Sequence, residues 1–417
     1  MIRSGQMRRV VITGLGTVNP LGNNVQEFWE NIKANKNGIS LIDQFDVSDF
    51  DVKYVGAVKG FDPSEYIDRK EARRMDRFTQ FAVCSTLQAL KMAGTDFKDL
   101  DPYRVGVMIG VGIGGLLLTE AEVTKFNEKP DKVSVFFIPM MIANMAAGTV
   151  AMKTGFKGDN FCTTTACSSG THAIGEAFRK IKDGYLDAAI CGGSEACISR
   201  FSLSSFNNMH ALSRATELEK ASTPFDLNRQ GFVLGEGCGI LCLEEYEHAK
   251  ARGANIIAEI AGYGATGDAF HMTSPSPTGE AAAHAMKMAY EEAGLRPEEV
   301  NYINAHGTST GLNDKYETIA IKLALGEDNA RKTVINSTKS MTGHLLGAAG
   351  GMEAVVTALS VKEGFVHRTI NYTTPDPECD LDYATDSNRS VDIKGALSNS
   401  LGFGGHNATI CIKKYEG

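Results

Sequence analysis

A run of mostly small polar residues precedes a helical pattern at residues 161–171, which read Phe-Cys-Thr-Thr-Thr-Ala-Cys-Ser-Ser-Gly-Thr. A run of small polar residues ends at Cys167, and residues 171–182 then carry apolar side chains at helical spacing. This pattern predicts a strand that turns directly into a helix, with Cys167 at or just before the helix N-terminus. Open α/β folds place functional residues at such turns. Because the positive end of a helix dipole stabilises a thiolate, we expect a lowered pKa for this thiol.

A similar pattern occurs later in the chain. Residues 336–347 read Asn-Ser-Thr-Lys-Ser-Met-Thr-Gly-His-Leu-Leu-Gly and precede a run of small and apolar residues that predicts a helix. His344 then takes the place that Cys167 has in the first segment, which indicates an internal duplication. A charged helical pattern ends near Gly253, and no Pro-rich or Ser-rich linker follows it. We therefore predict two similar halves, residues 1–253 and 254–417, packed as one body.

Short β-branched runs alternate with longer helical patterns through both halves. The expected strands are residues 10–13, 104–109, 188–192, 256–261, 301–304, 333–337 and 408–413. The expected helices are residues 78–93, 171–182, 278–293 and 345–362. Such alternation is typical of an α/β fold in which helices cover the sheets.

Composition excludes several classes of function. The 417 residues carry a formal net charge of −8, whereas binding to nucleic acid requires a basic surface. The nine cysteines form no CxxC pair, which favours reduced thiols in a cytoplasmic protein. The longest uncharged stretch, residues 133–152, contains Pro139, Asn144 and Gly148, so we expect core or interface there and no membrane span.

Two glycine-rich segments match a dinucleotide-binding pattern. They are residues 110–115, Gly-Val-Gly-Ile-Gly-Gly, and residues 262–267, Gly-Tyr-Gly-Ala-Thr-Gly. No acidic residue ends a strand at the right distance after the first, and Pro275 and Pro277 exclude a helix directly after the second. We therefore expect tight turns at both. No HExxH or similar spacing of histidines indicates a metal.

Two histidines follow expected strands, as Cys167 does. His306 lies in residues 304–310, Asn-Ala-His-Gly-Thr-Ser-Thr, and His344 precedes the last long helix. Lys339 lies close to His344 in the sequence, and Glu353 is its plausible partner because it is the lone charge in an apolar helix. A lone histidine is usually structural, but two at strand ends together with a cysteine favour a nucleophilic site.

With residues 402–405, Gly-Phe-Gly-Gly, these segments resemble the β-ketoacyl-[acyl-carrier-protein] synthases, closest to the elongating enzymes of bacterial fatty-acid synthesis. The resemblance covers about residues 8–414. It implies a thiolase-like fold of two βαβ-rich halves in a layered α-β-α-β-α arrangement, usually a homodimer. It also implies decarboxylative condensation of an acyl thioester with malonyl-carrier protein. Both substrates then arrive on the phosphopantetheine of acyl carrier protein, and no further cofactor or metal is expected.

The resemblance also implies roles for individual residues. Cys167 would be the nucleophile, His306 and His344 would bond the malonyl thioester oxygen, and Lys339 would tune their electrostatics. Phe403 would gate the site and supply an oxyanion amide. The remaining roles are phosphopantetheine binding by Thr308 and Thr310, lining of the acyl pocket by Ile113 and the partner subunit's Phe137, and docking of carrier protein by Lys70, Arg73 and Arg74.

Several alternatives stay open. A polyketide-type ketosynthase, a carrier-protein-binding homologue without turnover and a cysteine hydrolase would each use part of the same motif set. The sequence gives no preferred acyl length. Two positions depart from the family pattern: His406 replaces the usual threonine after the glycine loop, and His210 stands where an arginine often helps to dock carrier protein.

Overall fold

The computed structural model describes residues 8–417, so residues 1–7 of the predicted first half lie outside the described part. Ten strands form the main sheet. They are β1 (Val10–Val18), β4 (Val105–Gly110), β5 (Asn160–Phe161), β6 (Ala188–Glu195), β7 (Gly237–Glu245), β8 (Ala258–Gly267), β9 (Val300–Asn304), β10 (Val334–Asn336), β13 (Gly395–Gly402) and β14 (His406–Lys413). Two short hairpins lie outside it, β2 (Ser40–Leu41) with β3 (Tyr54–Val55), and β11 (Phe365–Val366) with β12 (Arg389–Ser390).

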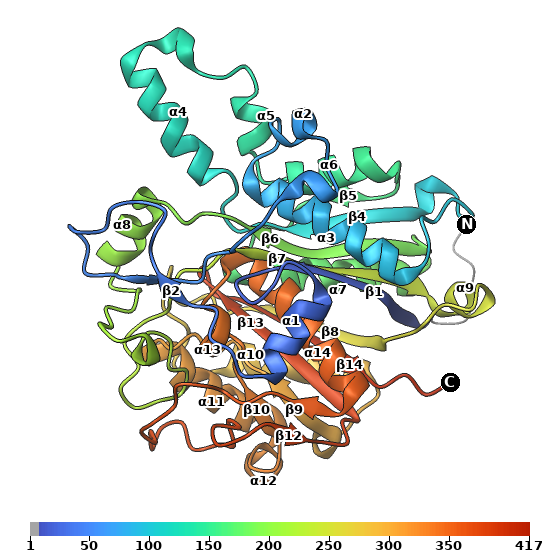
Figure 1. Ribbon diagram of the computed structural model, residues 1–417. Coiled ribbons are helices and arrows are strands. Elements are labelled where there is room, and N and C mark those ends of the chain that lie inside the picture. The colour runs from blue at the N-terminus through green and yellow to red at the C-terminus, as the bar shows by residue number, and fades with distance from the viewer. Residues whose placement is uncertain (1–7) are drawn as a thin grey trace.

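Helices lie on the two outer faces of the sheet and between its halves (Figure 1). The longer ones are α1 (Val25–Lys33), α3 (Arg77–Ala93), α4 (Leu116–Glu128), α6 (Met145–Thr154), α7 (Ser169–Lys182), α8 (Arg200–Asn208), α10 (Glu280–Glu292), α11 (Gly311–Leu325) and α14 (Ala349–Glu363). The shorter ones are α2 (Arg69–Ala72), α5 (Phe137–Met141), α9 (Tyr246–Ala251), α12 (Glu327–Ala330) and α13 (Lys339–Thr342). Two 3₁₀ turns matter for the site, η4 (Ala166–Ser168) and η7 (Leu346–Ala348).

The strand order is β10-β9-β13-β14-β8-β1-β7-β6-β4-β5. Each half of the sheet has five strands. Outward from the junction of the halves, the first half has the order β1-β7-β6-β4-β5 and the second has the order β8-β14-β13-β9-β10. Numbered along the chain within each half, both orders are first, fifth, fourth, second and third. The directions agree as well: the two inner pairings of each half are antiparallel and the two outer pairings are parallel. The halves join where Val10, Val11 and Ile12 of β1 pair with β8.

Equivalent glycines bring one outer helix close to each half-sheet. A Cβ at Gly16 of β1 would lie 1.8 Å from the Ser85 carbonyl oxygen of α3. A Cβ at Gly264 of β8 would lie 1.9 Å from the Ala285 carbonyl oxygen of α10. Any larger residue would push the helix off the sheet, so these positions require glycine. Residues 262–267 therefore lie in a strand and form no tight turn, which corrects our expectation for them.

The helices α7 and α14 pack between the two half-sheets. The helix α14 contacts β6 and β7 of the first half as well as β13 of the second, and it also contacts α7. The helices α3 and α6 cover the outer face of the first half-sheet, whereas α10 and α11 lie on the outside of the second. This arrangement confirms the α/β class and the layered thiolase-like architecture. The proposed division at residue 253 falls between α9 and β8 and stays a prediction.

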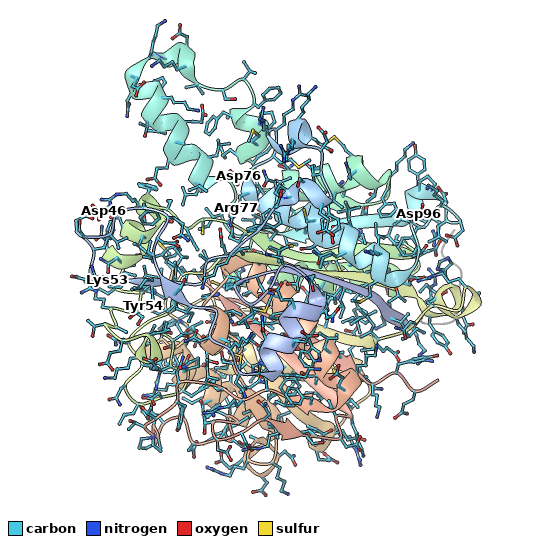
Figure 2. The ribbon with its side chains drawn as sticks, viewed as in Figure 1. Asp46, Lys53, Tyr54, Asp76, Arg77 and Asp96 are labelled. Atoms are coloured by element: carbon cyan, nitrogen blue, oxygen red, sulfur yellow. The ribbon has the colours of Figure 1, made fainter. Side chains whose placement is uncertain are left out.

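A projecting arm interrupts the outline of the molecule. The arm comprises residues 116–141, and Figure 1 shows its α4 and the following loop standing away from the body while α5 lies next to α2. The arm exposes large apolar side chains, including Val135, which is 87% exposed, and Phe126 and Ile138, which are more than half exposed. Figure 2 labels Asp76 and Arg77 at the first turn of α3, beneath α2 and α5. Across residues 8–417, no helix has the length and apolar character needed to cross a membrane.

Candidate active site

Cys167 lies in the turn η4, directly before α7, as the sequence predicts. The backbone of Ala166 is left-handed, with φ of 51°, which is strained for a residue with a side chain. The Ser168 hydroxyl lies 3.0 Å from the Ser400 carbonyl and 2.7 Å from the His406 carbonyl, so it ties the turn to β13 and β14. The nucleophile's turn is therefore fixed from the second half of the chain.

His306 follows β9 and is oriented through its backbone. Its N–H donates to Glu317 Oε1 and the N–H of Gly307 donates to Glu317 Oε2, each at 2.8 Å. Glu317 is buried on α11. A carboxylate that accepts two successive amides fixes the direction of this turn, so the imidazole points into the space in front of Cys167.

His344 lies between α13 and η7. Its N–H donates to the Val233 carbonyl at 2.7 Å, and the Phe232 ring packs edge-on against its imidazole, with centroids 5.3 Å apart. The helix predicted from residue 345 begins only at Ala349, so His344 precedes the helix by one 3₁₀ turn. The residue equivalent to Cys167 in the second turn is Gly347, which corrects the equivalence with His344 that we drew from the sequence.

The three side chains converge. The Cys167 sulfur and one nitrogen from each of His306 and His344 all lie within 4.8 Å of one another. The two imidazole rings are nearly perpendicular, at 85°, with centroids 5.2 Å apart. One nucleophilic sulfur thus faces two imidazole edges, each placed by a different loop.

Hydrogen bonds define the tautomer of each imidazole. The Lys339 ammonium lies 3.4 Å from Nδ1 of His306, and the N–H of Leu346 donates to Nδ1 of His344 at 3.3 Å. Both Nδ1 atoms therefore accept, and in a neutral ring the proton resides on Nε2. Burial, and next the charge of Lys339, holds the pKa of His306 and of His344 well below 6.5. Both are neutral rings that offer an Nε2–H donor.

Lys339 is buried and pairs with Glu353, the partner that the sequence indicated. Its Nζ lies 2.5 Å from Glu353 Oε1, and both side chains are almost inaccessible to solvent. Burial raises the pKa of Glu353 to about 7, while the Lys339 charge opposes that shift. The ammonium end of this pair lies behind His306.

The pKa of the Cys167 thiol differs from our expectation that it would be lowered. Burial raises the pKa of the Cys167 thiol to about 12, and the Lys339 charge and the Phe403 N–H directed at the sulfur lower it by less. Dehydration disfavours the thiolate more strongly than these groups favour it. Burial therefore favours the protonated thiol, and the sulfur would have to lose its proton to react as a nucleophile.

Cys167, His306 and His344 have donor types that also bind zinc, but their protonation does not suit a metal. A neutral imidazole binds a metal through its unprotonated nitrogen. That nitrogen is Nδ1 in both rings, and it already accepts a hydrogen bond. The Lys339 ammonium behind His306 would also repel a cation. These residues fit anion stabilisation better than metal binding.

A cavity of about 810 Å³ connects the site with solvent. Its inner wall contains Cys167, His306 and His344, and the side chains farther out include Met209, His210 and Leu312. The predicted residues Ile113, Thr308, Thr310 and Phe403 also line it. The two threonine hydroxyls lie 2.9 Å apart. A ligand reaching the sulfur passes these side chains.

The other predicted residues lie elsewhere. Phe137 begins α5 on the arm and does not line the cavity. Lys70 lies on α2, Arg73 and Arg74 follow it, and all three are exposed. The Arg74 guanidinium lies 5.3 Å from the centroid of Phe136, so α2 and the start of α5 form one surface. This surface is separate from the residues that line the cavity in the same chain.

Sequence reasoning missed the buried carboxylates behind the site. Glu317 orients the turn of His306, and Glu195 accepts amide hydrogen bonds from the turn that carries Ile113. Glu195 is the lone charge in an apolar segment, and that was the available signal for it, whereas Glu317 follows Asp314 and Lys315 and has no such signal. The first glycine-rich segment, at 110–115, folds around Glu195. An internal carboxylate thus occupies the place where a dinucleotide phosphate would bind.

The fold and the site together define a class. A cysteine at a strand-to-helix turn, two neutral imidazole donors and a duplicated five-stranded sheet are the features of a thiolase-like condensing enzyme, in which the donors stabilise an enolate next to an acylated sulfur.

Comparison with known proteins gives the family. Residues 7–249 match the N-terminal domain of β-ketoacyl synthases and residues 257–373 match the C-terminal domain. The chain belongs to the β-ketoacyl synthase family. It is 51% identical over 413 residues to the 3-oxoacyl-[acyl-carrier-protein] synthase 2 of Synechocystis sp., and 50% identical over 412 residues to that of Staphylococcus aureus. Each alignment covers 99% of both chains.

Solved structures agree with this assignment. A β-ketoacyl synthase from Burkholderia phymatum has a TM-score of 0.90 at 34% identity, with 98% of this chain and 100% of the other covered. A ketosynthase bound to a hexaketide, in complex with its type II polyketide acyl carrier protein, has a TM-score of 0.90 at 40% identity, with 99% and 100% covered. The predicted enzyme class, an acyltransferase that forms carbon–carbon bonds, is confirmed.

Proposed function

We propose that this chain elongates acyl groups carried by acyl carrier protein, as one condensation step of cytoplasmic fatty-acid synthesis. One observation carries the proposal: two imidazoles, each held as an Nε2–H donor, face a buried cysteine at the start of α7. Identities near 50% to two 3-oxoacyl-[acyl-carrier-protein] synthases support the substrate class. All nine cysteines are free, which suits a reducing compartment.

In the first half-reaction, the Cys167 sulfur attacks the thioester carbonyl of acyl-carrier protein. A sulfur–carbon bond forms to Cys167, the thioester bond to phosphopantetheine breaks, and the cysteine proton ends on the departing thiol. The Phe403 amide, which points at the sulfur, and the amide of Cys167 would hold the tetrahedral oxyanion. Thr308 and Thr310, on the wall of the cavity, would bond the phosphopantetheine arm.

In the second half-reaction, malonyl-carrier protein enters and its thioester oxygen accepts bonds from Nε2–H of His306 and His344. The bond to the carboxylate breaks and carbon dioxide leaves, so an enolate forms whose charge these donors stabilise. The enolate carbon attacks the acyl-cysteine, a carbon–carbon bond forms and the bond to the sulfur breaks. The thiolate then takes a proton from solvent, and the product is a 3-oxoacyl thioester two carbons longer.

Carrier protein would dock on the basic surface of Lys70, Arg73 and Arg74. Carrier proteins present an acidic face, and this surface is a concentration of positive charge in a chain whose net charge is −8. At the mouth of the cavity, Arg214 lies 3.2 Å from Nδ1 of His210, so a guanidinium accompanies the histidine that departs from the family pattern. A cation is thus present near His210, four residues farther along the chain.

The active unit would be a homodimer built through the arm. Exposed apolar side chains on the arm and the open edge of β5 are the surfaces that such an interface would cover. Phe137 would then line the pocket of the partner rather than that of its own chain, which explains why it lies outside the cavity here.

A polyketide-type ketosynthase is the second candidate. The 40% identity and full-length match to the ketosynthase that binds a hexaketide favour it. The higher identities, near 50%, are to the 3-oxoacyl synthases, so we place the chain in fatty-acid elongation. Hydrolysis is disfavoured because the cysteine is buried and both imidazoles are donors, so neither is free to activate water.

One experiment tests the proposal. Intact-protein mass spectrometry after incubation with acyl-carrier protein should show one acyl adduct on Cys167 that is absent from Cys167→Ala. Addition of malonyl-carrier protein should then convert the adduct into a 3-oxoacyl thioester and release one carbon dioxide. Release of free fatty acid would indicate a hydrolase, and no adduct would exclude the mechanism.

A further inference from the structure

Glu195 is a buried carboxylate that ends β6 and is 0% exposed. Its Oε2 accepts from the N–H of Gly112 at 2.8 Å, of Ile113 at 3.1 Å and of Gly347 at 3.2 Å. Its Oε1 accepts from the N–H of Gly114 at 3.0 Å. Four backbone amides thus converge on one side chain, which matches the roughly four acceptor sites of an ionised carboxylate.

These amides belong to two different turns. Residues 111–115 connect β4 with α4 and carry Ile113 on the wall of the cavity. Gly347 lies in η7, three residues after His344. The turns touch directly, because a Cβ at Gly347 would lie 2.2 Å from the Gly112 nitrogen. One carboxylate therefore joins the turn that lines the cavity to the turn that follows an imidazole donor.

Side-chain cations do not balance the charge of Glu195. Within residues 8–417 it takes part in no ion pair, and the amide dipoles of the two turns are its partners. Burial raises the pKa of Glu195 to about 7, while the amide hydrogen bonds from Gly114, Gly112, Gly347 and Ile113 lower it. A neutral amide in its place would direct an NH₂ group at N–H donors, and a shorter carboxylate would not span both turns.

We propose that Glu195 is a positioning residue that couples the acyl pocket to the decarboxylation site. By holding the Ile113 turn and the His344–Gly347 turn to one side chain, it makes the pocket wall and the enolate donor move as one unit. An acyl chain that displaces Ile113 then also displaces His344, so acyl length influences condensation as well as acylation. This inference rests on the proposed function, in which Ile113 contacts the acyl chain.

The first test compares two glutamine variants. Glu195→Gln removes the carboxylate at one end of β6. Glu244→Gln removes another buried carboxylate at the far end of the neighbouring strand β7, where Glu244 pairs with Ala188, so it is the matched control. Both are assayed for acylation of Cys167 across acyl lengths and for carbon dioxide release from malonyl-carrier protein by the acylated enzyme.

We expect Glu195→Gln to reduce the discrimination between the best and the worst acyl length about tenfold, because unpaired buried amides loosen the Ile113 turn. Carbon dioxide release should also lose its dependence on the length of the bound acyl group. Glu244→Gln should retain both patterns. Retention of both patterns in Glu195→Gln, in a variant that folds, would overturn the coupling.

The second test needs neither a variant nor substrate, so it separates this inference from the proposed function. Amide hydrogen exchange of the wild-type enzyme is followed by mass spectrometry at increasing sub-denaturing guanidinium concentrations. Peptides containing residues 112–114 and Gly347 should open together, with the same denaturant dependence. Independent opening of the two peptides would refute the coupling even if Cys167 becomes acylated as proposed.

Discussion

The Lys339 ammonium lies between two groups, 3.4 Å from Nδ1 of His306 and 2.5 Å from Glu353 Oε1. The contact with His306 determines which imidazole nitrogen carries the proton. The contact with Glu353 pairs the buried ammonium with a carboxylate, which offsets part of the cost of burying it. A residue that does not line the cavity thus determines which nitrogen of His306 can donate a hydrogen bond into the cavity.

Lys339→Met should abolish most decarboxylation while leaving the shape of the site intact. Without the ammonium, Nδ1 of His306 is no longer held as the acceptor, so the loss should approach that of an oxyanion donor, about 100- to 1,000-fold in carbon dioxide release. Glu353 is left buried without its partner, which should cost about 3–5 kcal/mol of unfolding free energy. Malonyl decarboxylation and denaturant unfolding measure the two effects.

The double variant Lys339→Met/Glu353→Gln separates these effects. It removes the unpaired charge, so the unfolding free energy should return close to that of the wild type. Decarboxylation should stay low because the donor to His306 is still missing. Recovery of both properties would show that Lys339 acts on stability alone.

The histidines should not titrate in the working range of pH. Burial, then Lys339, keeps the pKa of both His306 and His344 well below 6.5, and their neutral forms are the donors that we propose. Protonation is therefore confined to acidic pH, and carbon dioxide release by Cys167→Ala should be flat from pH 6 to 8. A fall in activity centred near pH 6.5 would mean that at least one imidazole has an ordinary pKa.

Reversing the charge of Lys70, Arg73 and Arg74 should raise the KM for carrier protein without changing turnover at saturation. Because the charges lie outside the cavity, they affect the association with carrier protein and not the condensation reaction itself. The effect should shrink as salt is added. The control carries the same three reversals at exposed lysines elsewhere, Lys36, Lys98 and Lys332. An equal loss in the control would refute docking at α2.

The arm should mediate the association of two chains into a dimer. Val135→Asp combined with Ile138→Asp places two charges on side chains that are 87% and 56% exposed in the single chain. If the arm forms the dimer interface, burial of these charges is unfavourable and sedimentation should show monomers. Leu323→Asp, on α11 at the opposite outer layer, is the control and should leave the mass unchanged. A wild-type monomer would exclude the homodimer directly.

Glu195 should make stability depend on pH. Its pKa is about 7 in the folded chain and ordinarily 4.5, so the folded state retains a proton that the unfolded state has lost between these values. The stability that this carboxyl contributes is present below pH 4.5 and is lost as pH rises through 7, by up to about 3 kcal/mol. Glu195→Gln does not titrate, so the wild type should lose unfolding free energy relative to it from pH 5 to 7.

Much of the fold could be predicted from local patterns. The strands β1, β4, β6, β9, β10 and β14 and the helices α3, α7 and α10 lie within a few residues of the predicted ranges. The helices α1, α4, α6, α8 and α11 were not predicted. The strands β7 and β13 were also missed, because Gly237 and Gly239 interrupt β7, and serines and Asn399 dilute the apolar pattern of β13. Partners from distant parts of the chain supply the burial that makes these segments strands.

The candidate site, like the fold, could be predicted from the sequence only in part. Cys167, His306 and His344 could be chosen from motifs, because the sequence predicts a strand before each of them. In the structure His306 follows β9 closely, whereas α13 separates His344 from β10. The protonation of the thiol could not be predicted, because the burial of Cys167 depends on the packing of apolar side chains from both halves and outweighs the effect of the helix N-terminus. Glu195 and Glu317 were also unpredictable, since their partners are backbone amides that only the folded turns bring together.

The left-handed residues before α7 and α14 have one more consequence. Ala166 and Leu346 have φ values of 51° and 50°, and each opens the 3₁₀ turn of its half. The same distorted bend is thus preserved twice, yet one copy bears the nucleophile and the other bears glycine. The two copies of the turn therefore differ in role: one carries the reactive sulfur, and the other, with glycine at the equivalent position, supports it structurally.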